Sequence, residues 1–175
     1  DKIISINKEN KTIKSESGKI QSYDKLLIAT GSTAFIPKTK GSDLENVIAF
    51  RTKADVDAII STIRKDKTAV VVGGGLLGLE AAYGIAKHGI KTILVHRSGS
   101  ILSQQLDSTG GKLLQRNLEK YGIEFKLNTT IKEISGDGIV EKVEFTDGVC
   151  VESNLVVFAT GIIPNTALAI DAQLD

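Results

Sequence analysis

Cysteine and histidine are scarce in this sequence of 175 residues, which holds one cysteine, Cys150, and two histidines, His88 and His96. A single thiol excludes an internal disulfide, a CxxC redox pair and a metal site built from several cysteines. Two histidines likewise exclude a histidine-rich metal site. We therefore expect no metal ion, and we interpret Cys150 as a structural residue of a surface strand rather than a redox centre.

An excess of charge of either sign is also lacking. Lys and Arg number 22 and Asp and Glu 21, so the formal net charge is +1. Proteins that bind nucleic acid carry a basic surface, and this sequence has no basic cluster beyond Arg64–Lys67, so we predict no nucleic-acid partner. No apolar run approaches the roughly 18 residues of a membrane span, and no signal peptide opens the chain. We expect a cytoplasmic protein with no membrane partner.

Methionine is absent altogether, even from position 1, and the sequence opens within the strand-like pattern Ile3, Ile4 and Ile6. The 41% apolar and 25% charged residues are typical of a globular protein, and the length allows one substantial core. The missing methionine fits either a processed mature domain or a piece of a longer chain. We favour the piece.

The first part of the sequence contains short strands. Strands are predicted over 2–6 and 11–14, on either side of a polar turn. The apolar run Leu26–Ala29 predicts a buried strand within 23–30, which leaves its sheet through a tight turn at Thr30-Gly31-Ser32. Residues 32–46, which include Pro37 and Gly41, are interpreted as a linker.

The middle of the sequence alternates helices and strands. Thr52 followed three residues later by Asp55 predicts a capping box at the start of a helix. A second predicted helix has Leu113, Leu114, Leu118 and Tyr121 on its inner side. Together the expected elements are the strand 68–72, the helix 79–87, the strand 91–95, the helix 107–120 and the strand 123–127. This βαβαβ order predicts a parallel, right-handed, doubly wound unit.

After this unit the pattern changes to short strands joined by glycine turns. Residues 131–152 predict an antiparallel meander, and 155–159 predict a final apolar strand. The fold class is therefore α/β, with a Rossmann-like βαβ unit on a parallel sheet plus an antiparallel meander.

A glycine loop joins the strand at 68–72 to the helix that follows. Gly73, Gly75 and Gly78 form a GxGxxG pattern: the first allows a sharp turn, the second lets the backbone approach a pyrophosphate, and the third lets the helix pack on the strand. An anion bound there lies at the helix N-terminus, where unpaired amides and the helix dipole favour it. We predict a dinucleotide site; the alternative is that the glycines only permit tight packing.

The end of the next strand indicates which dinucleotide binds. NAD and FAD sites place an acidic residue there to bind the ribose, but this sequence has His96-Arg97. Arg97 either faces a 2′-phosphate and favours NADPH or is a solvated surface charge. His96 is interpreted as a spacer or a ribose contact. Glu80 is expected in the first helical turn, either as an acid favoured by the helix dipole or as an acid near the nicotinamide.

Two stretches end in the same three residues: Tyr23–Gly31 and Asn154–Gly161 both finish in Ala-Thr-Gly and flank the glycine loop. With Gly73–Glu80 (GGGLLGLE) and Ala159–Asn165 (ATGIIPN), this sequence resembles the flavoprotein reductases of the pyridine nucleotide-disulfide oxidoreductase family. In that family a nicotinamide domain is inserted into an FAD domain. The stretches Gly73–Ala82, Gln105–Asp107 and Gly111–Glu119 are similar to those of the large subunits of NAD(P)H-dependent assimilatory nitrite reductases.

The resemblance implies a division of the chain and a set of cofactor-binding residues. It implies partial FAD-domain segments at 1–34 and 161–175 around an NAD(P)H-binding domain at 35–160. The FAD glycine loop and the later Gly-Asp flavin motif are absent, so FAD is implied only for the full-length parent. The residues implied to bind cofactor are Gly73, Gly74, Gly75, Leu76, Leu77, Gly78, Glu80, His96, Arg97, Gly161 and Ile162 on the nicotinamide side, and Ala29, Thr30 and Gly31 on the flavin side.

The function implied is the electron-entry portion of a flavoprotein oxidoreductase, which passes hydride from NAD(P)H to FAD. In a nitrite reductase the remaining FAD, iron–sulfur and sirohaem domains would be its partners. Rubredoxin or ferredoxin reductases and NADH oxidases of the same fold are alternatives, and a non-enzymatic dinucleotide sensor is an alternative of another class. No side chain is assigned as a catalytic acid or base. We expect this chain alone to bind NAD(P)H weakly, to hold no flavin and to be inactive.

Overall fold

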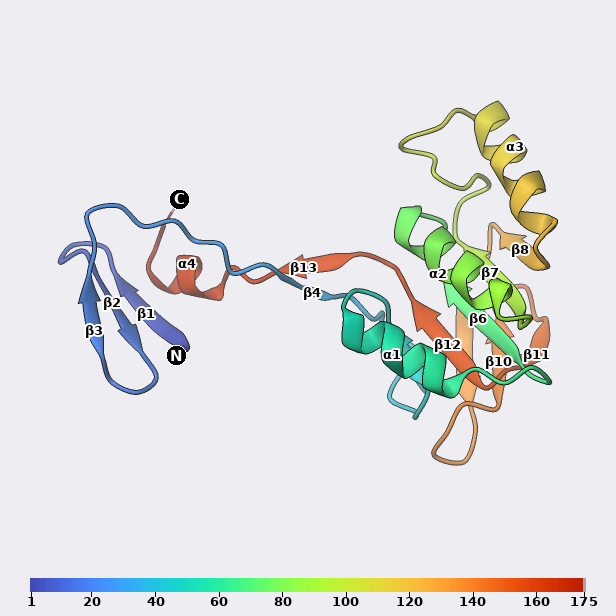
Figure 1. Ribbon diagram of the computed structural model, residues 1–175, viewed down its shortest axis with the longest axis horizontal. Helices are drawn as coiled ribbons and strands as arrows, with labels where there is room; N and C mark the ends of the chain where they lie inside the picture. The colour runs from blue at the N-terminus through green and yellow to red at the C-terminus, as the bar shows by residue number, and fades with distance from the viewer. Residues whose placement is uncertain (175) are drawn as a thin grey trace. The chain divides into compact units, whose positions relative to one another are not determined.

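A computed structural model describes residues 1–174 and divides the chain into two compact units (Figure 1). One unit contains residues 1–33 and the chain from Ile162 onward; the other runs from Ala34 to Gly161. The glycine loop belongs to the second, larger unit, which has its own buried core.

The smaller unit is built on a three-stranded antiparallel sheet of β1 (Ile3–Asn7), β2 (Thr12–Ser15) and β3 (Ile20–Ser22), with the short helix α4 (Ala167–Asp171) against β1. The strands β4 (Ser32–Ala34) and β13 (Ile162–Pro164) pair where the chain passes from one unit to the other. The sequence predicted the first two strands and missed β3, which has only three residues.

The predicted buried strand at 23–30 is wrong. None of these residues belongs to a strand, and Leu27 is 88% exposed. A buried strand of a parallel sheet needs paired strands beside it and packed layers on both faces. In the described part of the smaller unit, β1, β2 and β3 form an antiparallel sheet and β13 pairs with β4, and no strand pairs with residues 23–30.

The larger unit is organised around a five-stranded parallel sheet. Its order is β5-β12-β6-β7-β8, and every pairing between neighbours is parallel. The strands are β5 (Val47–Ala49), β6 (Thr68–Val72), β7 (Lys91–His96), β8 (Ile123–Leu127) and β12 (Leu155–Phe158). The predicted parallel unit is confirmed, and β5, which lies in a segment without a strand-like pattern, adds an edge that the sequence did not show.

Two layers cover the sheet, and they differ in kind. Alternate residues of β6 point to opposite faces: Ala69 and Val71 join a core with the helices, whereas Val70 and Val72 join a core with the meander. A doubly wound sheet would carry helices on both faces. Here the helices α1 (Lys53–Thr62), α2 (Leu76–Lys87) and α3 (Ser108–Glu119) pack on one face, and the predicted double winding is corrected.

Side chains cap two of these three helices, α1 at the capping box that the sequence predicted and α3 at Asp107. At α1 the Thr52 hydroxyl accepts from the Asp55 N–H at 3.3 Å, and the Asp55 carboxylate accepts from the Thr52 N–H at 2.7 Å. Asp107 caps α3 through the Gly110 N–H at 2.7 Å. The inner side of α3 is narrower than predicted, because Leu114 and Leu118 pack on the core whereas Leu113 is 62% exposed. Tyr121, just beyond the helix, packs edge-on against Tyr83 of α2.

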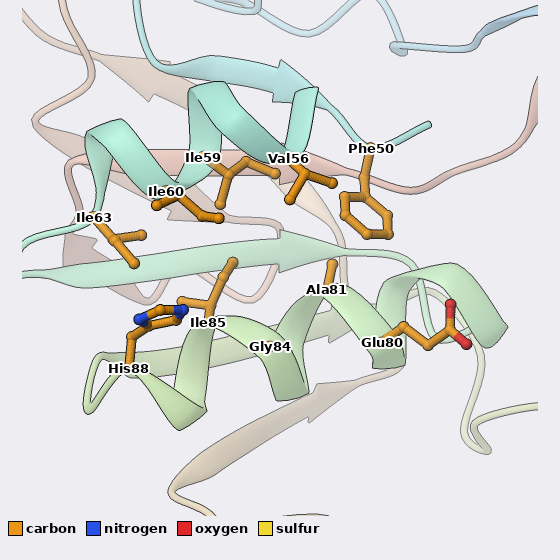
Figure 2. Close-up of a pocket in the computed structure, with 10 residues that line it drawn as sticks. All are labelled: Phe50, Val56, Ile59, Ile60, Ile63, Glu80, Ala81, Gly84, Ile85 and His88. Atoms are coloured by element: carbon orange, nitrogen blue, oxygen red, sulfur yellow. The ribbon is translucent and has the colours of Figure 1, made fainter. Parts of the chain in front are cut away.

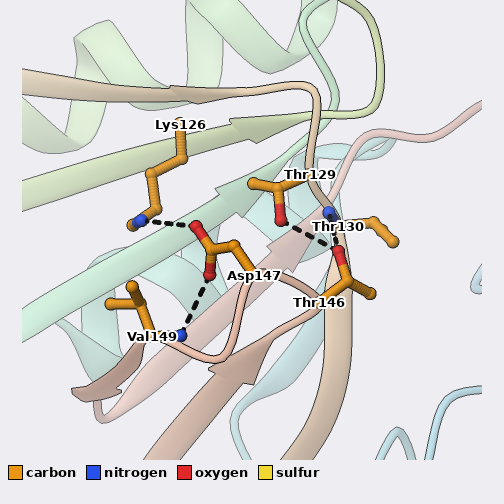
Figure 3. Close-up of polar contacts among 6 residues, drawn as sticks. All are labelled: Lys126, Thr129, Thr130, Thr146, Asp147 and Val149. Carbon is orange, nitrogen blue, oxygen red and sulfur yellow. Dashed lines mark hydrogen bonds and ion pairs between the residues drawn. The ribbon is translucent and has the colours of Figure 1, made fainter.

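The other layer is the predicted antiparallel meander of β9 (Ile131–Ser135), β10 (Lys142–Phe145) and β11 (Cys150–Glu152), on which Cys150 is exposed. Polar contacts join it to β8 (Figure 3). The Lys126 ammonium lies 3.0 Å from the Asp147 carboxylate, which also accepts from the Val149 N–H at 3.0 Å. These donors lower the pKa of Asp147, the Val149 amide most strongly.

Within residues 1–174, no helix is long and apolar enough to cross a membrane. The same residues bring together no group of three or more His, Cys, Asp or Glu side chains that could hold a metal ion.

Candidate functional site

The glycine loop lies between the carboxyl end of β6 and the N-terminus of α2, and three hydrogen bonds hold its first two residues. The Gly73 N–H donates to the Val95 carbonyl at 2.9 Å. The Gly74 N–H donates to Nδ1 of His96 at 3.1 Å, and the Gly74 carbonyl accepts from the Leu102 N–H at 2.9 Å. Consequently the main chain is fixed immediately before Gly75, the N-cap of α2.

Each glycine of the pattern has a different requirement. A Cβ at Gly73, where φ is +124°, would lie 2.4 Å from the Ala159 carbonyl oxygen, and a Cβ at Gly78 would lie 1.9 Å from the Gly73 carbonyl oxygen. Both positions therefore exclude a side chain because backbone lies against them. Gly75 is the opposite: nothing lies within 4 Å of its Cβ position, and the residue is exposed. The protein itself does not need a glycine there, so the space in front of Gly75 remains open for a ligand.

The start of α2 offers hydrogen-bond donors at this open space. Gly75 is the N-cap and supplies no capping side chain. The first amides of a helix have no partner within the helix, and they carry the positive end of its dipole. Leu76 and Leu77, in the first turn, are 62% and 45% exposed. Uncapped amides beside a residue without a side chain fit a diphosphate.

At the end of β7, His96 is half-buried and Arg97 is exposed. Burial lowers the pKa of the His96 imidazole, and the positive charge of Arg97 lowers it further. A neutral imidazole agrees with the hydrogen bond that Nδ1 accepts from Gly74. From the sequence, His96 was interpreted as a spacer or a ribose contact. The contact of His96 with the glycine loop was not predicted.

The carboxyl end of β12 lies beside the same loop. The Ala159 N–H donates to the Val72 carbonyl at 2.9 Å, and the chain then turns through Gly161, where φ is +124°. The Thr160 hydroxyl donates to the Phe35 carbonyl at 2.6 Å, and the Phe35 N–H donates to the Gly161 carbonyl at 3.0 Å. Thus Gly161 is placed at the loop's edge of the sheet by backbone bonds.

The other Ala-Thr-Gly segment repeats this bonding pattern in the smaller unit. The Thr30 hydroxyl donates to the Asn165 carbonyl at 2.6 Å, and the Asn165 N–H donates to the Gly31 carbonyl at 2.9 Å. Phe35 comes five positions after Thr30, and Asn165 comes five positions after Thr160. Each threonine thus bonds to a residue that follows the other Ala-Thr-Gly segment. Each segment is therefore fixed in the same way where the chain leaves its unit.

Glu80 lies in the second turn of α2, because the helix begins at Leu76 and not at Leu79 as predicted. A helix dipole acts within about the first turn, so the dipole explanation for Glu80 is weaker than the sequence indicated. The exposed Glu80 lies at one end of an apolar groove of about 220 Å³ between α1 and α2, with Phe50 opposite and His88 at the far end (Figure 2).

Taken together, the larger unit brings most of the predicted nicotinamide-side residues to one edge of its sheet. These are Gly73, Gly74, Gly75, Leu76, Leu77, Gly78, His96, Arg97 and Gly161. Ala29, Thr30, Gly31 and Ile162 belong to the smaller unit. Sequence reasoning missed Leu102, which holds Gly74 through its backbone amide, because a backbone contact leaves no trace in residue type.

A parallel strand, an open glycine turn and an uncapped helix N-terminus are features that this chain shares with dinucleotide-binding α/β proteins. The chain belongs to the pyridine nucleotide-disulphide oxidoreductase family, whose family model matches residues 1–175. This confirms the resemblance drawn from the glycine loop and the two Ala-Thr-Gly segments.

Two nitrite reductases are similar to this chain in sequence over nearly its whole length. The chain is 43% identical over 172 residues to a nitrite reductase [NAD(P)H] of Bacillus subtilis, a match that spans 98% of this chain and 21% of that protein. It is 40% identical over 177 residues to the nitrite reductase (NADH) large subunit of Escherichia coli, spanning 100% of this chain and again 21% of the relative. The chain therefore spans about a fifth of the length of these relatives.

Among solved structures, a ferredoxin reductase from Rhodopseudomonas palustris superposes with a TM-score of 0.91 at 26% sequence identity. The superposition takes in 99% of this chain and 43% of that one. The predicted fold class is thereby confirmed.

Proposed function

We propose that this chain is the dinucleotide-binding portion of a flavoprotein oxidoreductase, which binds NAD(P)H and places its nicotinamide for hydride transfer to FAD. The observation that carries the proposal is the open space at Gly75, beside helix amides that no side chain caps. When bound, the nicotinamide supplies a hydride, and the flavin of the full-length parent accepts it.

The chain's own residues bind and orient. The amides at the start of α2 hold the diphosphate, and its two negative charges lie at the positive end of the helix dipole. Arg97 faces the adenosine end from the carboxyl end of β7. Leu76, Leu77, Glu80, Gly161 and Ile162 are proposed for the nicotinamide side, and Ala29, Thr30 and Gly31 for the flavin side. No residue of this set has to act as an acid or base.

Within the family, we propose the electron-entry portion of a nitrite reductase. The identities of 43% and 40% to two nitrite reductases support this choice over the rubredoxin or ferredoxin reductases and NADH oxidases of the same fold. The partners proposed are the remaining FAD, iron–sulfur and sirohaem domains of the parent, and the location proposed is the cytoplasm.

Gly75→Ala tests the diphosphate site. Gly75 has φ −83° and open space at its Cβ position, so alanine should lower the free energy of unfolding by no more than about 1 kcal/mol, the cost of replacing glycine by alanine at an N-cap. The methyl group enters the space assigned to the diphosphate, and the affinity for NADH, measured by calorimetric titration, should fall by at least about tenfold. Unchanged affinity in the folded variant would place the dinucleotide elsewhere.

Arg97→Ala tests the choice between NADH and NADPH. If the guanidinium binds the 2′-phosphate, the variant should lose about tenfold in affinity for NADPH, as expected for the loss of one charge-assisted hydrogen bond. Its affinity for NADH should not change. The two ligands differ only in that phosphate, so NADH is the internal control of the titration. No loss for either ligand would assign Arg97 to the solvated surface, and equal losses for both would place its contact on a part of the dinucleotide that the two ligands share.

A further inference from the structure

His96 occupies the position at which NAD sites of this type place an acidic residue, and its imidazole lies against the glycine loop. Nδ1 accepts the Gly74 N–H at 3.1 Å, and a Cβ on Gly74 would lie 2.7 Å from ring atoms of His96. The ring is therefore packed against the main chain of the loop as well as bonded to it.

The hydrogen bond from Gly74 differs from the other two that hold the loop. Gly73 with Val95 and Gly74 with Leu102 are joined through backbone atoms alone, and neither bond changes with pH. Only the third passes through a group that can take up a proton. Gly75 and the open N-terminus of α2 follow Gly74 directly. A rotation of the Gly74 peptide plane would therefore reorient the amides proposed to bind the ligand.

We infer that His96 is a positioning residue of the dinucleotide site. Its neutral imidazole fixes the glycine loop, and protonation of the ring removes this contact and lowers the affinity for the dinucleotide. The inference rests on the proposed function, because it assigns a role to His96 in that same site. Asp or Glu at this position would bind the ribose directly; His96 acts one step back, through Gly74.

The surroundings of His96 favour its neutral form. Burial lowers the pKa of the imidazole below its ordinary 6.5, and the positive charge of Arg97 acts in the same direction. Leu127 of β8, paired with His96, and Thr129, whose N–H donates to the His96 carbonyl, carry no charge. Lys126, the charged neighbour on β8, is paired with Asp147.

The sign of the pH effect follows from the proton count. An imidazolium carries hydrogen on both nitrogens, so Nδ1 can no longer accept from Gly74. The neutral form binds more tightly, so affinity is highest above pH 6.5, the ordinary pKa of an imidazole, and decreases as pH falls through the lowered pKa of His96. Loss of one hydrogen bond to the loop corresponds to about a twofold to tenfold decrease in affinity.

Two measurements on the 175-residue chain test this. The first follows the Gly74 amide resonance by NMR from about pH 8 to about pH 5 without ligand. It should titrate together with the His96 ring. The second measures affinity for NAD⁺ over the same range, since NAD⁺ has no 2′-phosphate and so leaves out the contact proposed for Arg97.

Variants separate positioning from mere packing. In His96→Asn, the side-chain oxygen stands where Nδ1 stood and can accept from Gly74 without titrating. Affinity for NAD⁺ at neutral pH should stay within about twofold of the unchanged chain, and its decrease at acid pH should disappear. His96→Leu, which has no acceptor, should bind about twofold to tenfold more weakly at every pH. His88→Asn alters the other histidine of the sequence, at the far end of α2, and should keep the full pH dependence.

The inference is wrong if NAD⁺ binds and its affinity either rises at acid pH or falls equally in His96→Asn. It is also wrong if the Gly74 amide does not titrate with His96. Failure of the proposed function gives a different result: no saturable binding of NAD⁺ at any pH, with the Gly74 amide still following His96. In that case the hydrogen bond stands but has no dinucleotide to position.

Discussion

Phe145→Ala is expected to lower the free energy of unfolding by about 3–5 kcal/mol, as truncation of a buried aromatic residue does elsewhere. Phe145, at the end of β10, is fully buried, and it packs in the core that the meander forms with the parallel sheet. The Lys126 ammonium lies 5.2 Å from the centre of its ring and adds a cation–π contact that alanine removes. Urea-induced unfolding followed by circular dichroism measures the difference.

Val149→Ala is the matched control in the same meander. Val149 is 42% exposed, and its bonds to Phe145 and Asp147 are made by backbone atoms that alanine keeps. The control should therefore change the free energy of unfolding by no more than about 0.5 kcal/mol. Similar small losses in both variants would mean that the meander is not part of the core of the larger unit.

Gly78→Ala should destabilise the chain by about 1–3 kcal/mol and abolish dinucleotide binding. Its Cβ would lie 1.9 Å from the Gly73 carbonyl oxygen and 2.9 Å from the carbonyl carbon, and a backbone neighbour cannot rotate away as a side chain can. Either α2 or the loop must move, which costs about as much as inserting a methylene into a packed core. Urea-induced unfolding and titration with NADH measure the two effects.

Gly84→Ala provides a comparison within the same helix. Gly84 lies inside α2, is exposed, and has nothing within 4 Å of its Cβ position. Alanine is the better helix former, so this variant should gain about 0.5–1 kcal/mol. One chemical change in one helix thus has opposite signs at two positions, and a destabilised Gly84→Ala or an unaffected Gly78→Ala would contradict the close contact of loop and helix.

Local signals predicted local structure well. The capping box at Thr52 and Asp55 was read from two residues three positions apart and is present with both of its hydrogen bonds. The strand at 68–72 was likewise indicated by residue type and order. Such features are recoverable because the residues that make them are neighbours in sequence.

Predictions that depended on a distant partner failed or were incomplete. The apolar run Leu26–Ala29 has the composition of a buried strand, yet composition cannot say whether a neighbouring strand is there to pair with it. Leu113 was assigned to the inner side of α3 by periodicity alone, whereas the core reaches only part of that helix. The start of α2 at Leu76 also differs, since glycines discourage a helix in sequence but are accepted when packing requires them.

Residue order and spacing were enough to predict a strand, a glycine loop and a helix in succession, and with them an anion site at Gly73–Gly78, because these features depend on neighbours in sequence and on the missing side chains of glycine. Which glycine is open to a ligand and which is closed by backbone follows from the packing of distant segments. Tertiary packing alone placed His96 on the Gly74 amide across 22 positions of sequence. The pairing of β7 with β6 brings those two residues together, and no residue type announces it.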